Sequence, residues 1–301
     1  MRLRRGFTLT EMLFVLVIFG LVAAATMKII VRQQKFYAST SDLMAMRNTL
    51  RDVGEALPAD LRGISSIGGD IYAMSDSAID FRLASGISVI CSIAVGRLAV
   101  VIPPTTLASR TALTTWSTAP TLGDTAFVYN DGATSSISDD TWDKNAVAAT
   151  LAAGNCPTTS GFTATTSEAS SSQTLTFTTA LNANVQVGAP IRFYRRARYK
   201  LFQPTANGAW YLGYTDCPAG VCGSLQAVAG PYLAYSATPG STGLRFVYRD
   251  VNGSVTATPN QVARIDIIAK AQTDNPIRMP GRPEGYFSDS LVVTVALRNR
   301  T

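Results

Sequence analysis

The sequence contains no histidine. Histidine is the side chain that most often acts as a general base near neutral pH, and its neutral imidazole is a common metal ligand. The chain also lacks a P-loop and a glycine-rich dinucleotide-binding turn after a strand. The sequence therefore offers no catalytic constellation, and we expect a protein that is not an enzyme and that uses no cofactor.

Charged residues are scarce as well. They make up 15% of the 301 residues, against 47% hydrophobic residues. Three arginines at the very start, Arg2, Arg4 and Arg5, account for half of the formal net charge of +6. The rest of the chain is only mildly basic, so its charge does not by itself indicate a nucleic-acid-binding protein.

Proline is absent between Phe7 and Ala56, and an uninterrupted helix is expected over that stretch. Its first part, residues 7–27, contains only four polar side chains and is long enough to span a bilayer. The arginines precede this span and no other charge but Glu11 interrupts it, which predicts a cytoplasmic N-terminus and an exported remainder.

Beyond the span, apolar residues recur at spacings of three, four and seven, which predicts an amphipathic helix that packs against a core. Pro58 is expected to end or kink this helix. A helix over residues 7–57 would be on the order of 75 Å long. The predicted core-facing stripe consists of Phe36, Leu43, Met46, Leu50, Val53 and Leu57.

Glu11 distinguishes three interpretations of the N-terminal segment. A carboxylate inside a membrane span costs ~2.5–3.5 kcal/mol on insertion scales, so it is expected to have a function and a partner. A cleaved secretory signal, with small residues at 23–25 for cleavage, gives Glu11 no partner, and neither does a simple membrane anchor. The third interpretation is a segment whose Glu11 pairs with another subunit.

The segment Gly6-Phe7-Thr8-Leu9-Thr10-Glu11, with its basic leader and apolar helix, resembles the class III signal of type IV pilins and type II secretion pseudopilins. The resemblance implies that a prepilin peptidase cleaves after Gly6 and methylates Phe7. It also implies that Glu11 neutralises the new ammonium group of a neighbouring subunit during assembly. Because an unpaired buried charge is costly, this pairing would favour the filament over a lone subunit in lipid.

The C-terminal half extends the resemblance. Its strand-like segments at residues 243–250, 262–268 and 289–299, and the helix-end segment 57–62, are similar to the PilW and GspJ type of minor pilin. This implies a low-copy subunit that helps to initiate or cap pilus assembly near the tip. The implied partners are other minor and major pilins or pseudopilins, the prepilin peptidase and the inner-membrane assembly platform. A secretion pseudopilin and a tip adhesin or DNA-binding minor pilin remain alternatives.

The expected organisation has three parts: a leader over residues 1–6, a helix over 7–57 and a β-rich head over 58–301. A Thr/Ser-rich insertion is expected at about 105–189. The fold class is α+β, a long helix packed on an antiparallel sheet. The expected location is the inner membrane, as a single-pass protein with a periplasmic head, and then the filament. Strands are predicted at 78–83, 87–91 paired with 97–102, 125–129, 174–179, 190–202, 209–214, 244–249, 255–257, 263–271 and 291–297.

The four cysteines are expected to form disulfides, because an exported chain meets an oxidising compartment. Cys217 and Cys222 bracket a short loop with turn residues, which would leave Cys91 and Cys156 as the second pair. Four cysteines allow three pairings, and the sequence does not decide among them.

Two further clusters are candidate sites. Asp139, Asp140 and Asp143 form an oxygen-rich segment that could hold Ca²⁺, although the spacing fits no EF-hand and a solvated loop is the simpler interpretation. In a strand over 190–202, five side chains would share one face, which could contact DNA, face solvent or form ion pairs with a partner subunit. These are Arg192, Tyr194, Arg196, Arg198 and Lys200.

Overall fold

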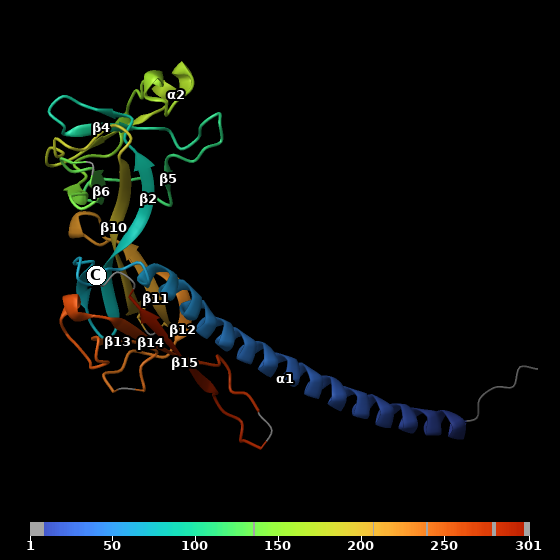
Figure 1. Ribbon diagram of the computed structural model, residues 1–301. Helices are drawn as coiled ribbons and strands as arrows, with labels where there is room; N and C mark the ends of the chain where they lie inside the picture. Colours follow the sequence, from blue (N-terminus) through green and yellow to red (C-terminus); the bar gives the residue numbers. More distant parts are fainter. Residues whose placement is uncertain (1–8, 135, 207, 239, 279–280, 298–301) are drawn as a thin grey trace, which may run out of the picture.

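The computed structural model describes residues 9–134, 136–206, 208–238, 240–278 and 281–297. Helix α1 (Leu9–Leu61) extends from the head as a long, gently curved arm (Figure 1). The helix continues through Pro58 and ends at Leu61, about one turn later than expected. Proline removes one helical hydrogen bond, but Leu57 and Leu61 on either side are completely buried, and their packing keeps the last turn helical.

The head covers only the C-terminal part of α1. The buried helix residues follow the expected spacing of three and four from Met46 onward, and Leu43 packs against them. Phe36, expected in the same stripe, is 68% exposed, although Ile277 and Arg278 of the head line a hollow beside it. The buried residues of the helix are Met46, Thr49, Leu50, Val53, Leu57, Pro58 and Leu61.

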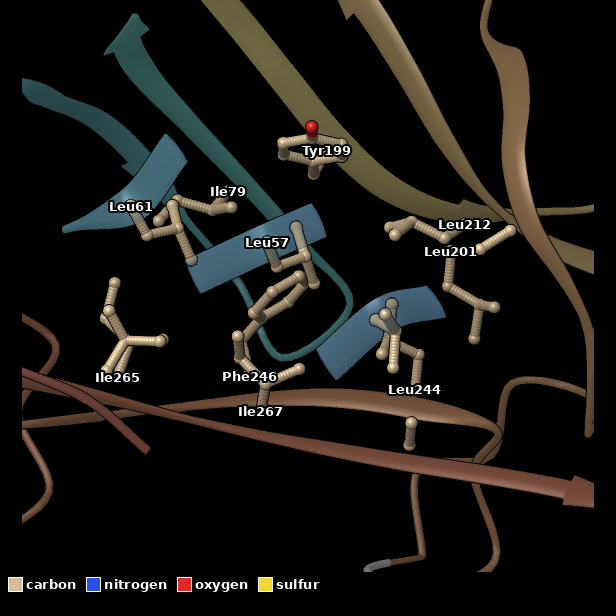
Figure 2. Packing of buried hydrophobic residues seen from close by; sticks show 14 of the residues in the cluster. Leu57, Leu61, Ile79, Tyr199, Leu201, Leu212, Leu244, Phe246, Ile265 and Ile267 are labelled. Carbon is tan, nitrogen blue, oxygen red and sulfur yellow. The ribbon is translucent and has the colours of Figure 1, made fainter. Parts of the chain in front are cut away.

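The helix lies between two antiparallel sheets. One is a three-stranded sheet of β13 (Leu244–Arg249), β14 (Arg264–Gln272) and β15 (Ser288–Ala296). Figure 2 shows Leu57 and Leu61 between Phe246, Ile265 and Ile267 of this sheet and Ile79 and Tyr199 of the other. This helix-centred core confirms the α+β, pilin-like fold.

The second sheet is built on two long neighbouring strands, β2 (Ala78–Val89) and β10 (Pro190–Phe202). They pair antiparallel from Ala78↔Lys200 to Val89↔Pro190. The other edge of β10 pairs first with β6 (Thr125–Asn130) and then with β11 (Trp210–Asp216). The β2–β10 pair therefore runs through both halves of the head. The sheet is completed by β1 (Ile71–Met74), β5 (Thr115–Trp116), β7 (Thr141–Ala146) and β12 (Gln226–Tyr232).

A second core lies at the far end of the β2–β10 pair and contains no residue of α1. We call residues 90–189, which surround this core together with the adjoining ends of β2 and β10, the distal lobe (Figure 1). It includes helix α2 (Thr166–Ser170) and a small sheet in the order β3-β4-β9-β8. The strands of that sheet are β3 (Ser92–Ile93), β4 (Ala99–Ile102), β8 (Ala152–Ala153) and β9 (Gln173–Thr176).

Two expected hairpins form differently. Residues 87–89 belong to β2, and β4 pairs with β3 and β9. The expected pairing of 87–91 with 97–102 is therefore wrong except at Cys91, whose N–H donates to the carbonyl of Val101 (2.9 Å). The turn at Asn252-Gly253 returns the chain to a single bridge, Arg249↔Val255, in place of the expected strand at 255–257. Strands β7 and β12 were not expected, since neither has a clear apolar alternation in its sequence.

Candidate assembly helix and head surfaces

The N-terminal part of α1 is an apolar surface that the head leaves uncovered. Every residue from 9 to 38 is exposed, and Phe14 and Phe19 are each 70% exposed. Within the described part of the chain, α1 is the one helix long and apolar enough to cross a membrane, and none of its most apolar stretch is buried. An exposed apolar surface of this length requires lipid or other protein to cover it.

Glu11 lies in the first turn of α1, on this exposed arm. A carboxylate there is favoured by the positive end of the helix dipole. Gly6 and Phe7, the expected cleavage and methylation residues, lie outside the described residues. The roles of all three residues therefore remain predictions.

The five residues expected on one face of β10 do share that face, opposite the buried Ile191, Phe193 and Ala197. A carboxylate from the neighbouring strand lies among them. Asp80 of β2 accepts hydrogen bonds from Arg198 (Nε to Oδ1, 2.5 Å) and Arg196 (Nη2 to Oδ2, 2.7 Å), and it is 2% exposed. Burial opposes ionisation of Asp80, but hydrogen bonds from the two arginines outweigh it and hold the pKa of Asp80 below its ordinary value.

The other members of this face are also partly engaged. The guanidinium of Arg192 lies 4.1 Å from the ring centroid of Trp142, in a cation–π contact. The ring of Tyr194 packs edge-on against the ring of Phe127, and the two ring centroids are 5.3 Å apart. Lys200 is exposed. The face is thus less positive and less open than its sequence indicates, because Asp80 and two aromatic rings already contact most of its members.

A buried ion pair on the opposite face of β10 was not expected from the sequence. Arg195 donates to both carboxylate oxygens of Asp124 and also contacts Asp216. These bonds raise the pKa of Arg195, against the effect of its burial. Asp124 lies 71 residues away along the chain, and no sequence spacing links the two.

The structure contains two disulfides. One joins Cys91 to Cys156 and the other joins Cys217 to Cys222. The first closes 65 residues of the distal lobe, and the second closes a five-residue separation in a loop after β11. Both are compatible with an exported head.

The three carboxylates of the Ca²⁺ candidate do not converge. Asp139 accepts from the backbone N–H groups of Ala133 and Thr134, Asp140 from the Tyr129 hydroxyl, and Asp143 from Asn130. The hydrogen bond to Asp140 raises the pKa of Tyr129 to about 12. Over the described ranges, no group of three or more acidic, histidine or cysteine side chains could hold a metal ion. The segment is better explained by its own loop contacts.

Comparison with known proteins identifies the start of the chain. Residues 1–27 match the family model of the prokaryotic N-terminal methylation motif. No curated protein and no solved structure matches the chain. The match covers the expected leader at residues 1–6, Glu11 and the apolar start of α1. The chain therefore carries the N-terminal methylation motif of type IV pilins and pseudopilins on an α+β, pilin-like fold.

Proposed function

We propose that this chain is a minor type IV pilin that enters a filament through α1 and helps to initiate or cap assembly near the tip. The observation that carries the proposal is the uncovered apolar arm of α1, which begins within the methylation motif. Lipid covers this arm before assembly, and the helices of other pilins cover it in the filament. Prepilin peptidase and the inner-membrane assembly platform are the partners between these two states.

The distal lobe supports a position at the end of the filament. It lies beyond the C-terminal end of α1 and away from the exposed arm (Figure 1). If subunits stack along their helices, this lobe occupies space where the next subunit would sit. A terminal subunit has no such neighbour, so a bulky distal lobe is compatible with that position.

The geometry does not favour DNA binding by the face of β10. Two of its four cations already share the carboxylate of Asp80, and a third stacks on Trp142. Phosphate binding would have to compete with these contacts. We therefore retain the filament role as the proposal.

The test is mass spectrometry of the N-terminal peptide from membranes and from sheared filaments, for the wild type and a Glu11→Ala variant. We expect a methylated Phe7 terminus in both wild-type fractions. We expect the variant to be present in membranes and reduced at least about tenfold in filaments, the equivalent of ~1.4 kcal/mol, because the ammonium group loses its partner. Glu55→Ala, an exposed helix residue paired with Arg51, is the matched control and should leave incorporation unchanged.

A terminus near residue 25 or an intact Met1 would contradict the pilin pathway. Normal filament numbers in a deletion strain would contradict a role in initiation. Normal piliation combined with a loss of protein secretion would instead identify a secretion pseudopilin.

A further inference from the structure

The first three charged residues that follow the apolar span are all basic. There is no acidic residue between Met12 and Ser41, whereas Lys28, Arg32 and Lys35 occur in this stretch. Their spacing of four and three places them on one face of α1. The part of α1 from residue 9 to residue 27 rises about 28 Å, close to the thickness of a bilayer's hydrocarbon core. Lys28 therefore lies at the level where the span meets lipid headgroups.

A fourth cation reaches this face from a distant part of the chain. Arg278 belongs to the connection between β14 and β15, and it is exposed. It lines a hollow of about 590 Å³ along α1 together with Lys28, Arg32 and Lys35. The remaining lining residues of the hollow are apolar: Ala24, Met27 and Val31.

These four cations have no acidic partner among the described residues, for none of them forms an ion pair. Six arginines of the head differ in this respect, because each pairs with an aspartate: Arg82, Arg195, Arg196, Arg198, Arg249 and Arg264. Four like charges along one hollow repel one another, and an anion shared among them would remove that cost.

We propose that Lys28, Arg32, Lys35 and Arg278 bind the phosphate of an anionic phospholipid headgroup in the leaflet from which α1 emerges. The apolar part of the hollow favours lipid over an acidic protein segment, because Ala24 and Met27 continue directly into the span and would contact the acyl chains. The headgroup joins the helix to the head at the membrane surface. This inference rests on membrane insertion of α1 and not on the role at the filament tip.

The test uses the full-length processed protein in mild detergent, titrated with phosphatidylglycerol or phosphatidylcholine and observed by native mass spectrometry. We expect the wild type to bind phosphatidylglycerol at least about tenfold more tightly. An Arg32→Gln/Arg278→Gln double variant should lose about 25-fold in this affinity, since each basic side chain near a membrane surface contributes roughly fivefold. The variant should keep the wild-type unfolding temperature, because both side chains are exposed.

The matched control is Arg110→Gln/Lys144→Gln, which removes the same charge from exposed positions of the distal lobe and should change nothing. Equal binding of the two lipids would overturn the proposal, as would wild-type affinity in the Arg32/Arg278 variant. Complete competition by millimolar inorganic phosphate would show a site for the free ion and also overturn it. Unchanged lipid binding with loss of co-purifying subunits would assign the cluster to a protein partner instead.

Discussion

Asp80 partly neutralises a strand face that the sequence pattern of β10 alone predicts to be basic. The alternation along β10 predicts correctly that Arg196 and Arg198 share a face, because side chains alternate strictly in a strand. The carboxylate between them lies 116 and 118 residues earlier in the chain and could not be paired with them by spacing. It becomes their neighbour only through the register of β2 with β10.

We expect Asp80→Asn to destabilise the protein by about 3 kcal/mol. Removing one partner of a buried ion pair costs ~3–5 kcal/mol, and the lower end applies because the side chains of Arg196 and Arg198 are 27% and 34% exposed. Urea denaturation at neutral pH measures this difference. Asp131→Asn, at an exposed position, should change stability by no more than about 0.5 kcal/mol.

The difference in stability between wild type and Asp80→Asn should depend on pH. Because the folded-state pKa of Asp80 is lowered, its ionised form stabilises the native state fully above the unfolded-state pKa of about 3.9. That stabilisation is lost as the pH falls through the lower folded-state value. The difference in the free energy of unfolding between wild type and Asp80→Asn should therefore be constant from pH 5 to 7. It should become smaller below about pH 4. A difference that becomes larger in acid would contradict this assignment.

At the scale of the element, α1 has two parts with different requirements. The C-terminal part is stabilised by burial against two sheets, while the N-terminal part is exposed in the isolated chain. Substitutions in the two parts should consequently differ in their effect on the free energy of unfolding.

Leu57→Ala should lower the free energy of unfolding by ~2–5 kcal/mol, since it removes a completely buried side chain and leaves a cavity. Phe36→Ala should leave it nearly unchanged, because Phe36 is 68% exposed. Chemical denaturation in detergent compares the two. An equal loss of stability in both variants would mean that the head covers more of α1 than the structure shows.

The elements that the sequence predicted best are those whose pattern is local. Helix α1 follows from an unbroken apolar span and a stripe at helical spacing, and β10 was predicted with its exact limits from 13 residues of alternation. The end of α1 at Leu61 was missed because long-range packing of Leu57 and Leu61 outweighs the local effect of Pro58. The pairing of β4 with β9 was missed for a similar reason, as 71 or more residues separate the partners.

The candidate sites follow the same rule. The methylation motif is a continuous stretch and was readable directly, whereas Arg278 lies about 250 residues from the helix face that it joins. Nothing in the sequence alone places the two together.

For the molecule as a whole, the two cores should differ in their dependence on a disulfide. The Cys91–Cys156 bond closes a loop of 65 residues within the distal lobe, and such a crosslink stabilises by about 4 kcal/mol in the chain-entropy account. We expect a Cys91→Ser/Cys156→Ser variant to open the distal lobe first. Hydrogen exchange should accelerate in β4 and β9 and stay slow in the buried part of α1.

Cys217→Ser/Cys222→Ser is the control, because this bond lies outside the second core and closes a much shorter loop. It should leave exchange in the distal lobe at the wild-type rate. Equal acceleration throughout the head would mean that the two cores unfold as one cooperative unit.

The β2–β10 pair also sets how the molecule responds to mechanical tension. Eleven residue pairs join the two strands, which run from the helix-centred core into the distal lobe. Because both strands make this connection, a pull between the distal lobe and α1 would load the two backbones side by side, and both would have to extend before the two cores could separate.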